Sequence, residues 1–150
     1  MSILAIAAVT AALSSPVPLQ AAPDTDSATR PALNVELPNV AGTTADPTCG
    51  GLAELARIAF CVASTQAGMQ AVADAYTSDF AQQGWLVGAG DENLIVYVRR
   101  REGGGCDAFQ MRAFTDESRV PAPGAPAYLA FATIPGDICS TAPVESAPPQ

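Results

Sequence analysis

Four cysteines, Cys49, Cys61, Cys106 and Cys139, constrain the fold of this 150-residue chain more than any other feature. An even number of cysteines in a short exported chain predicts two disulfide bonds. A zinc site would instead show close pairs such as C-x-x-C, often together with histidine. The nearest two cysteines here have eleven residues between them, and the chain has no histidine. We therefore predict two disulfides and neither a metal nor a cofactor.

How the cysteines pair depends on the fold of residues 51–63. Apolar residues recur there at helical spacing, but residues 58–63 alone also have the character of a short buried strand. One continuous helix would hold Cys49 and Cys61 about 18 Å apart, too far for a disulfide, so each would pair with one of the other two cysteines. A turn before the strand would instead allow Cys49 to pair with Cys61, and the remaining two with each other. The sequence leaves both pairings open.

The N-terminus carries a targeting signal. Residues 3–13 read ILAIAAVTAAL, which is shorter than the roughly 20 residues that span a bilayer but matches the apolar region of a secretory signal peptide. We predict that residues 1–22 are a signal peptide cleaved after Ala21 or Ala22, and that the mature protein is periplasmic or secreted. No membrane span is expected after the leader is removed.

Composition divides the rest of the chain. Residues 23–47 are rich in Pro, Ala, Thr and Asp, and residues 140–150 read STAPVESAPPQ. Both segments bury too little apolar surface to offset the entropy of ordering. They are predicted to be a flexible tether and a disordered tail. Residues 48–139 lie between them, and the hydrophobic content of the chain, 49%, is enough for a core there. We predict one domain over 48–139.

The strongest helix signal is an apolar stripe formed by Met69, Val72, Ala73, Tyr76 and Phe80. Ser64 or Thr65 is expected to cap the start of this helix. Gly84 followed by Trp85 predicts that the helix ends in a Schellman motif.

Strand-forming segments follow the helix. Residues 94–98, 106–114 and 127–134 are rich in β-branched, aromatic or alternating apolar residues; residues 85–87 are a shorter apolar run, and 88–93 resemble a turn. The predicted fold is α+β, with one or two helices packed on a three- to four-stranded antiparallel meander held by disulfides.

Charge excludes several function classes. Fifteen acidic residues face seven basic ones, all of them arginine, for a net charge of −8. A chain this acidic lacks the basic footprint that nucleic acids or anionic membranes require. Without histidine or lysine, the usual serine and cysteine catalytic arrangements are absent. Arginine as the sole base, together with abundant Ala and Pro, is typical of GC-rich bacterial genomes.

Two groups of charged residues are candidate binding or catalytic groups. Arg99 and Arg101, with Arg112 on the neighbouring predicted strand, form a candidate anion-binding patch; the alternative is a charged strand end that prevents edge aggregation. The acidic pairs at 91–92 and 116–117 would suit glycoside hydrolysis if they faced each other across a cleft, but acids in turns are ordinarily solvated.

The sequence therefore predicts a non-enzymatic interaction, inhibitor or accessory module of the cell envelope, with an envelope protein as its partner. An exposed apolar patch with a polar rim would favour this function. The alternatives are a module that binds a small anion or other small ligand through the arginines, and a minor carboxylate-based hydrolase.

Overall fold

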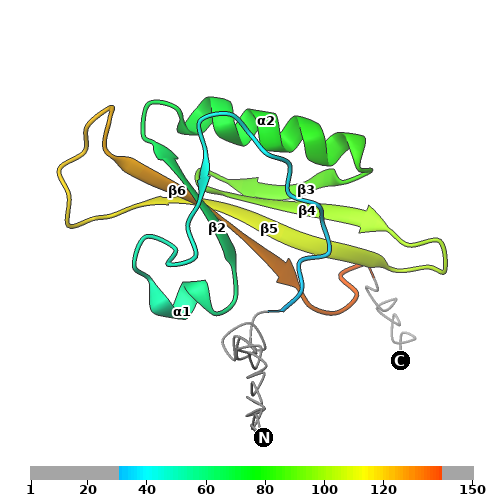
Figure 1. Cartoon of the computed structure of the whole chain (residues 1–150). Coiled ribbons are helices and arrows are strands. Elements are labelled where there is room, and N and C mark those ends of the chain that lie inside the picture. The colour runs from blue at the N-terminus through cyan, green and yellow to red at the C-terminus, as the bar shows by residue number, and fades with distance from the viewer. Residues whose placement is uncertain (1–30, 140–150) are drawn as a thin grey trace, which may run out of the picture.

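The computed structural model describes residues 31–139 and builds them around a six-stranded antiparallel sheet with the strand order β1-β2-β6-β5-β4-β3 (Figure 1). The strands are β1 (Thr44–Ala45), β2 (Phe60–Thr65), β3 (Leu86–Asp91), β4 (Leu94–Arg100), β5 (Cys106–Thr115) and β6 (Pro126–Ile134), and the helices are α1 (Ala53–Ala56) and α2 (Met69–Gln82). The α+β class is confirmed. The expected three or four strands are too few, because two strands precede α2.

The two strands beyond the expected three or four, β1 and β2, lie before α2. Residues 60–65 form β2, and α1 is only four residues long, so the strand interpretation of this region is the right one. The chain turns before β2 and brings the Cα atoms of Cys49 and Cys61 to 5.2 Å, and Cys106 bonds Cys139 with a Cα separation of 5.3 Å. The two disulfides follow the second of the pairings that the sequence left open.

Strand β3 is longer than its glycines suggested. The segment 88–93 was expected to be a turn, but β3 continues to Asp91 with a bulge between Val87 and Ala89. Gly88 occupies this bulge, where a Cβ atom would lie 2.6 Å from Cγ2 of Val98. A glycine in a strand often marks such a bulge or a close approach rather than the end of the strand.

The C-terminal end of α2 is the predicted Schellman motif. Gly84 has φ +83, the Trp85 N–H donates to the Phe80 carbonyl at 2.9 Å, and the Gly84 N–H donates to the Ala81 carbonyl at 3.1 Å. The N-terminal end differs from the prediction, because the helix begins after Gly68 and the expected cap residues belong to β2.

The helix α2 connects two strands that lie toward opposite edges of the sheet. From β2, α2 crosses to the opposite edge and delivers the chain to β3, after which β3, β4, β5 and β6 form a meander and β6 closes against β2. α2 lies above the sheet and α1 below it (Figure 1). The two faces of the sheet are therefore covered by different elements.

We call the side under α2 the closed face. Its centre is an aromatic cluster in which Phe80 of α2 lies 4.9 Å from Phe109 and 5.2 Å from Tyr97, measured between ring centroids. Trp85 packs edge-on against Phe109 at 4.8 Å. All of these rings are buried. Further buried members of the cluster are Val62, Val72, Tyr76, Met111, Leu129 and Phe131.

Residues 31–43, which we call the strap, pack on the closed face. Val35 is buried in the aromatic cluster, and the strap is tied to the end of α2 by Gln83, whose side chain accepts from the Glu36 N–H at 3.2 Å and donates to the Glu36 carbonyl at 2.8 Å. The domain therefore begins before Thr48, and the expected tether over 23–47 does not hold for its described part. The apolar residues Leu33, Val35 and Leu37 alternate along the strap and pack against the aromatic cluster. Residues 1–30 and 140–150, with the predicted signal peptide and tail, lie outside the described residues.

Candidate functional site

The side of the sheet opposite α2 carries the candidate site. Directly paired residues in an antiparallel sheet share a face, and the register places Leu86 and Ala89 of β3 on this side together with Leu94, Val96 and Val98 of β4. We call these five residues the open face. Leu86 is 70% exposed, Ala89 is exposed, and the three residues of β4 are half-buried. β4 thus buries Tyr97 on the side under α2 and leaves apolar side chains accessible on the other side, whereas every residue of β3 is exposed.

Polar residues border the open face. Asp91 ends β3, Arg100 ends β4, and Gln110 and Arg112 follow on β5, all of them on the same side of the sheet. Asp91, Arg100 and Arg112 are exposed. An apolar surface with a polar rim is the arrangement found at protein interaction sites.

The segment 46–59, which we call the α1 lobe, covers the part of this side that belongs to β2 and β6. The Cys49–Cys61 disulfide packs there against Ala59, Ala130 and Ala132. Small side chains at the contact let the lobe lie close to the sheet. The lobe therefore forms one wall beside the open face.

The start of the α1 lobe is fixed by the carboxylate of Asp46. Its two oxygens accept the Thr48 N–H at 2.9 Å, the Thr48 hydroxyl at 2.6 Å and the Gly50 N–H at 2.7 Å. Burial raises the pKa of Asp46, but the hydrogen bonds from Thr48 and Gly50 outweigh it and leave the pKa below its ordinary value of 3.8. The ionised form that holds the lobe is therefore the form present at neutral pH.

A groove of about 470 Å³ lies where the lobe meets the end of β5 and the start of β6. Phe114 and Tyr128 stack there with their ring centroids 5.2 Å apart, and the groove is also lined by Leu55, Arg112 and Glu117. This volume is within the range of small-molecule sites.

The three arginines of the predicted anion-binding patch do not converge. Arg99 lies on the closed side, with its guanidinium 4.3 Å from the centroid of the Trp85 ring and hydrogen bonds to the carbonyls of Gln83 and Asn34 at 3.5 Å. Arg112 lies on the opposite side of the sheet, paired with Leu94 at the other end of β4. No single anion could contact both guanidinium groups.

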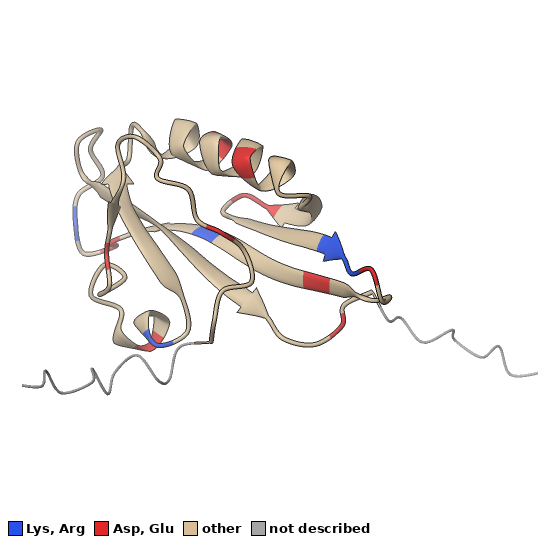
Figure 2. Cartoon of the chain, turned by 45° about the vertical axis from the view of Figure 1, so that its right-hand side comes forward, with Lys and Arg blue, Asp and Glu red and all other residues tan. Residues whose placement is uncertain are grey.

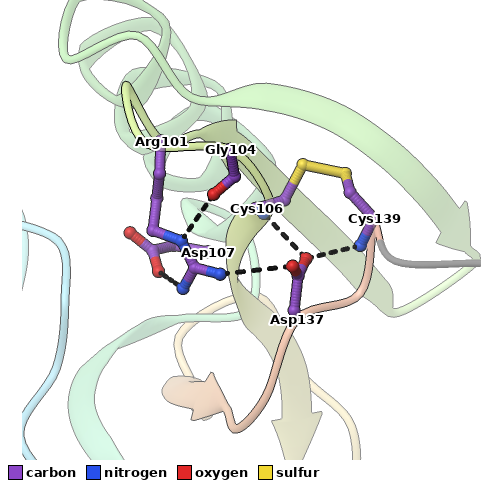
Figure 3. The surroundings of a disulfide bond; sticks show 6 residues. All are labelled: Arg101, Gly104, Cys106, Asp107, Asp137 and Cys139. Atoms are coloured by element: carbon purple, nitrogen blue, oxygen red, sulfur yellow. Dashed lines mark hydrogen bonds and ion pairs between the residues drawn. A yellow bond between two sulfur atoms is a disulfide. The ribbon is translucent and has the colours of Figure 1, made fainter.

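Arg101 belongs to a clasp around the Cys106–Cys139 disulfide (Figure 3). Its guanidinium forms ion pairs with Asp107 at 3.0 Å and Asp137 at 3.4 Å. Asp137 also accepts the backbone N–H groups of Cys106 at 2.8 Å and Cys139 at 3.0 Å. The sequence did not single out Asp137, although its place in a Pro-Gly-Asp turn beside a cysteine was a signal. Because Arg101 is already paired with two carboxylates, we interpret this cluster as a structural clasp and not as an anion-binding site.

The two acidic pairs, at 91–92 and 116–117, do not face each other across a cleft; each is held in its own turn. The Asp91 carboxylate accepts the N–H of its neighbour Glu92 at 2.8 Å. Asp116 accepts from Ser118, whose hydroxyl lies at 2.6 Å, and from Arg119 at 3.0 Å. Hydrogen bonds from Ser118, chiefly from its hydroxyl, lower the pKa of Asp116. A carboxyl group held ionised in this way is poorly suited to act as a general acid at neutral pH.

The open face escaped sequence reasoning for a physical reason. The run LIVYV in β4 is apolar at every position, which is the pattern of a strand buried on both sides. The structure covers one side only.

Among residues 31–139, no group of three His, Cys, Asp or Glu side chains is placed to hold a metal ion, and neither described helix is long and apolar enough to cross a membrane.

Comparisons with protein family models, with curated proteins and with solved structures found no match to this chain.

Proposed function

We propose that this chain is a non-enzymatic interaction module, exported to the bacterial periplasm or cell exterior, which binds a protein partner of the cell envelope through the open face. The observation that carries the proposal is the accessible apolar surface of β3 and β4, centred on Val96 and bordered by Arg100 and Arg112. This is the surface expected of an interaction module, an inhibitor or an accessory subunit.

The composition of β4 supports a bound state in which a partner covers the open side of this strand. A strand that is apolar at consecutive positions is typical of sheets with both faces buried. In the described chain α2 and the strap cover one side of β4, and the α1 lobe covers only the neighbouring strands on the other. A partner that packed on the open face would bury Leu94, Val96 and Val98. These side chains would then be covered as Tyr97 is covered on the closed face.

The surface is also held rigid. β4 is hydrogen-bonded on both sides, to β3 and β5, and the Cys106–Cys139 disulfide fixes the start of β5. A pre-organised surface loses little conformational entropy on binding, so more of the contact energy appears as affinity. The partner surface that fits is apolar at its centre, with carboxylates placed to reach Arg100 and Arg112.

A photocrosslinking residue at Val96 tests the binding surface in an exporting host. We expect one discrete adduct with one envelope protein, and no such adduct from the same residue at the exposed Ser78 on α2. The purified adduct partner should then bind the wild-type domain and lose affinity for Val96→Lys but not for Val120→Lys in the β5–β6 loop. Equal crosslinking from both positions, or equal binding by both variants, would contradict the proposal.

Export is tested separately by intact mass. Expressed with its own N-terminus, the protein should lose about 20 residues on export and contain no thiol that reacts before reduction. A full-length chain with free thiols would overturn the proposed location.

A second candidate function rests on the groove beside the α1 lobe. Stacked Phe114 and Tyr128 with the exposed cation Arg112 suit a small ligand with an aromatic body and an anionic group. Benzoate is a suitable probe. Its titration should shift the NMR signals of Phe114 and Tyr128 in the wild type and not in Arg112→Gln; signals that do not move in the wild type would exclude this function for such ligands.

A further inference from the structure

Strand β3 ends the sheet on one side and presents an exposed edge. Within residues 31–139 it pairs only with β4, and all six of its residues are exposed. Val87 is 58% exposed although it points to the side of the sheet that α2 covers elsewhere. An edge strand carries a row of N–H and C=O groups that can pair with another strand.

The two edges of the sheet differ in how they are protected. Proteins blunt edge strands by keeping them short, by placing Lys or Pro on them, or by a β-bulge. The edge strand β1 has two residues, which is too short to serve as a template. β3 reads LVGAGD over Leu86–Asp91, with no proline and no basic residue, so the bulge at Gly88 is the one such device within it.

The β3 edge has opposite charges at its two ends. Asp91 and Glu92 lie at the turn into β4. Leu86, at the other end, pairs with Val98, so Arg100 lies just beyond that end on the adjacent strand. Figure 2 shows acidic residues at the turn between β3 and β4 and basic residues at the far end of β4.

We propose that β3 pairs in antiparallel fashion with β3 of a second copy of this chain, forming a symmetric dimer in which two sheets become one. A two-fold arrangement places the acidic end of each β3 beside the basic end of the other. Leu86 then faces Asp91 of the second copy, and Gly88 faces Ala89. No two like charges are directly opposite in this register.

Geometry and side-chain size agree with this register. Glu92 of one copy and Arg100 of the other lie two strand spacings apart, about 10 Å, which long side chains can bridge. Arg100 is exposed and makes no ion pair with the described residues. The bulge lies at the centre of the pairing, where the small residues Gly88 and Ala89 let the two backbones approach. The two open faces would form one continuous apolar surface.

This dimer does not depend on the open face binding a partner, because Val87 tests the edge and Val96 tests the face. Sedimentation equilibrium on the oxidised full chain, from micromolar to millimolar concentration, should show a reversible monomer–dimer equilibrium. Val87→Lys should raise the dimer dissociation constant by about tenfold or more. Val120→Lys makes the same change at a site 84% exposed in the β5–β6 loop and should leave the constant unchanged.

Charge reversal tests the register. Glu92→Arg and Arg100→Glu should each weaken the dimer, and the double variant should restore it. Without any variant, the amides of Val87 to Gly90 should gain protection from hydrogen exchange as the concentration rises. A monomer throughout the concentration range, a dimer that Val87→Lys leaves intact, or a double variant no tighter than the single variants would each overturn the proposal.

Discussion

The two faces of the sheet come from the same strands but are built from different residues. The closed face is aromatic and sealed, with Phe80 in contact with Tyr76, Tyr97, Phe109 and Phe131. The open side is aliphatic, partly bare, and covered elsewhere by a short lobe fixed by a disulfide. The difference shows how a small domain can concentrate its stability in one face and keep the other available for binding.

The most damaging change to the closed face is Phe80→Ala. Phe80 is fully buried at the centre of the aromatic cluster, and truncating such a ring costs about 3–5 kcal/mol of unfolding free energy. Val96→Ala on the open face removes a half-buried side chain and should cost about 1 kcal/mol or less. Urea unfolding of both variants measures the difference. Similar losses would mean that the open face contributes to the core as the closed face does.

The two disulfides should differ in what they contribute. Cys49–Cys61 joins residues 12 apart and Cys106–Cys139 joins residues 33 apart. If chain entropy dominates, replacing both cysteines of a pair by alanine costs about 3 kcal/mol for the first and about 4 kcal/mol for the second. Urea unfolding of the two double variants under identical conditions gives the order. The reverse order would show that packing of the α1 lobe, rather than loop closure, sets the contribution of Cys49–Cys61.

The closed face was largely predictable from sequence, and the open side was not. The stripe in α2 and the Gly84–Trp85 ending are local signals, so they placed the helix and its buried rings correctly. Strands β1 and β2 depend on partners distant in sequence, and β2 joins the sheet through β6, which follows more than 60 residues later. No local pattern specifies such a pairing.

The candidate site was missed for the same reason. Whether Val96 and Val98 are covered depends on which elements reach that side of the sheet, and apolar spacing does not encode this. The arginines were grouped by adjacent strands, without the register that places Arg99 and Arg112 at opposite ends and on opposite sides. Cysteine pairing needed the turn before β2, which a short apolar run does not determine.

Alkaline pH should weaken the closed face. Burial raises the pKa values of Tyr76 and Tyr97 above 10.0, although hydrogen bonds from Thr43 and Thr77 oppose the shift. A raised pKa in the folded state means that stability is fully present below pH 10.0 and is lost as the pH rises through the folded-state values. Thermal unfolding across this range should show the loss. Tyr97→Phe cannot ionise and should lose a smaller share of its neutral-pH stability; an equal loss would exclude Tyr97 as a source.

Acid should act on the other side of the sheet, with a smaller effect. Asp46 has a lowered pKa, so its contribution is present above pH 3.8 and is lost as the pH falls through the folded-state value. Hydrogen exchange below pH 3.8 should therefore expose the Thr48 and Gly50 amides while the amides of β5 stay protected, and Asp46→Asn should remove most of this pH dependence. Simultaneous loss in both regions would mean that the lobe and the closed face unfold as one unit. Separate loss would make the lobe the adjustable wall of the binding side, because it could loosen while the closed face holds the open face in place.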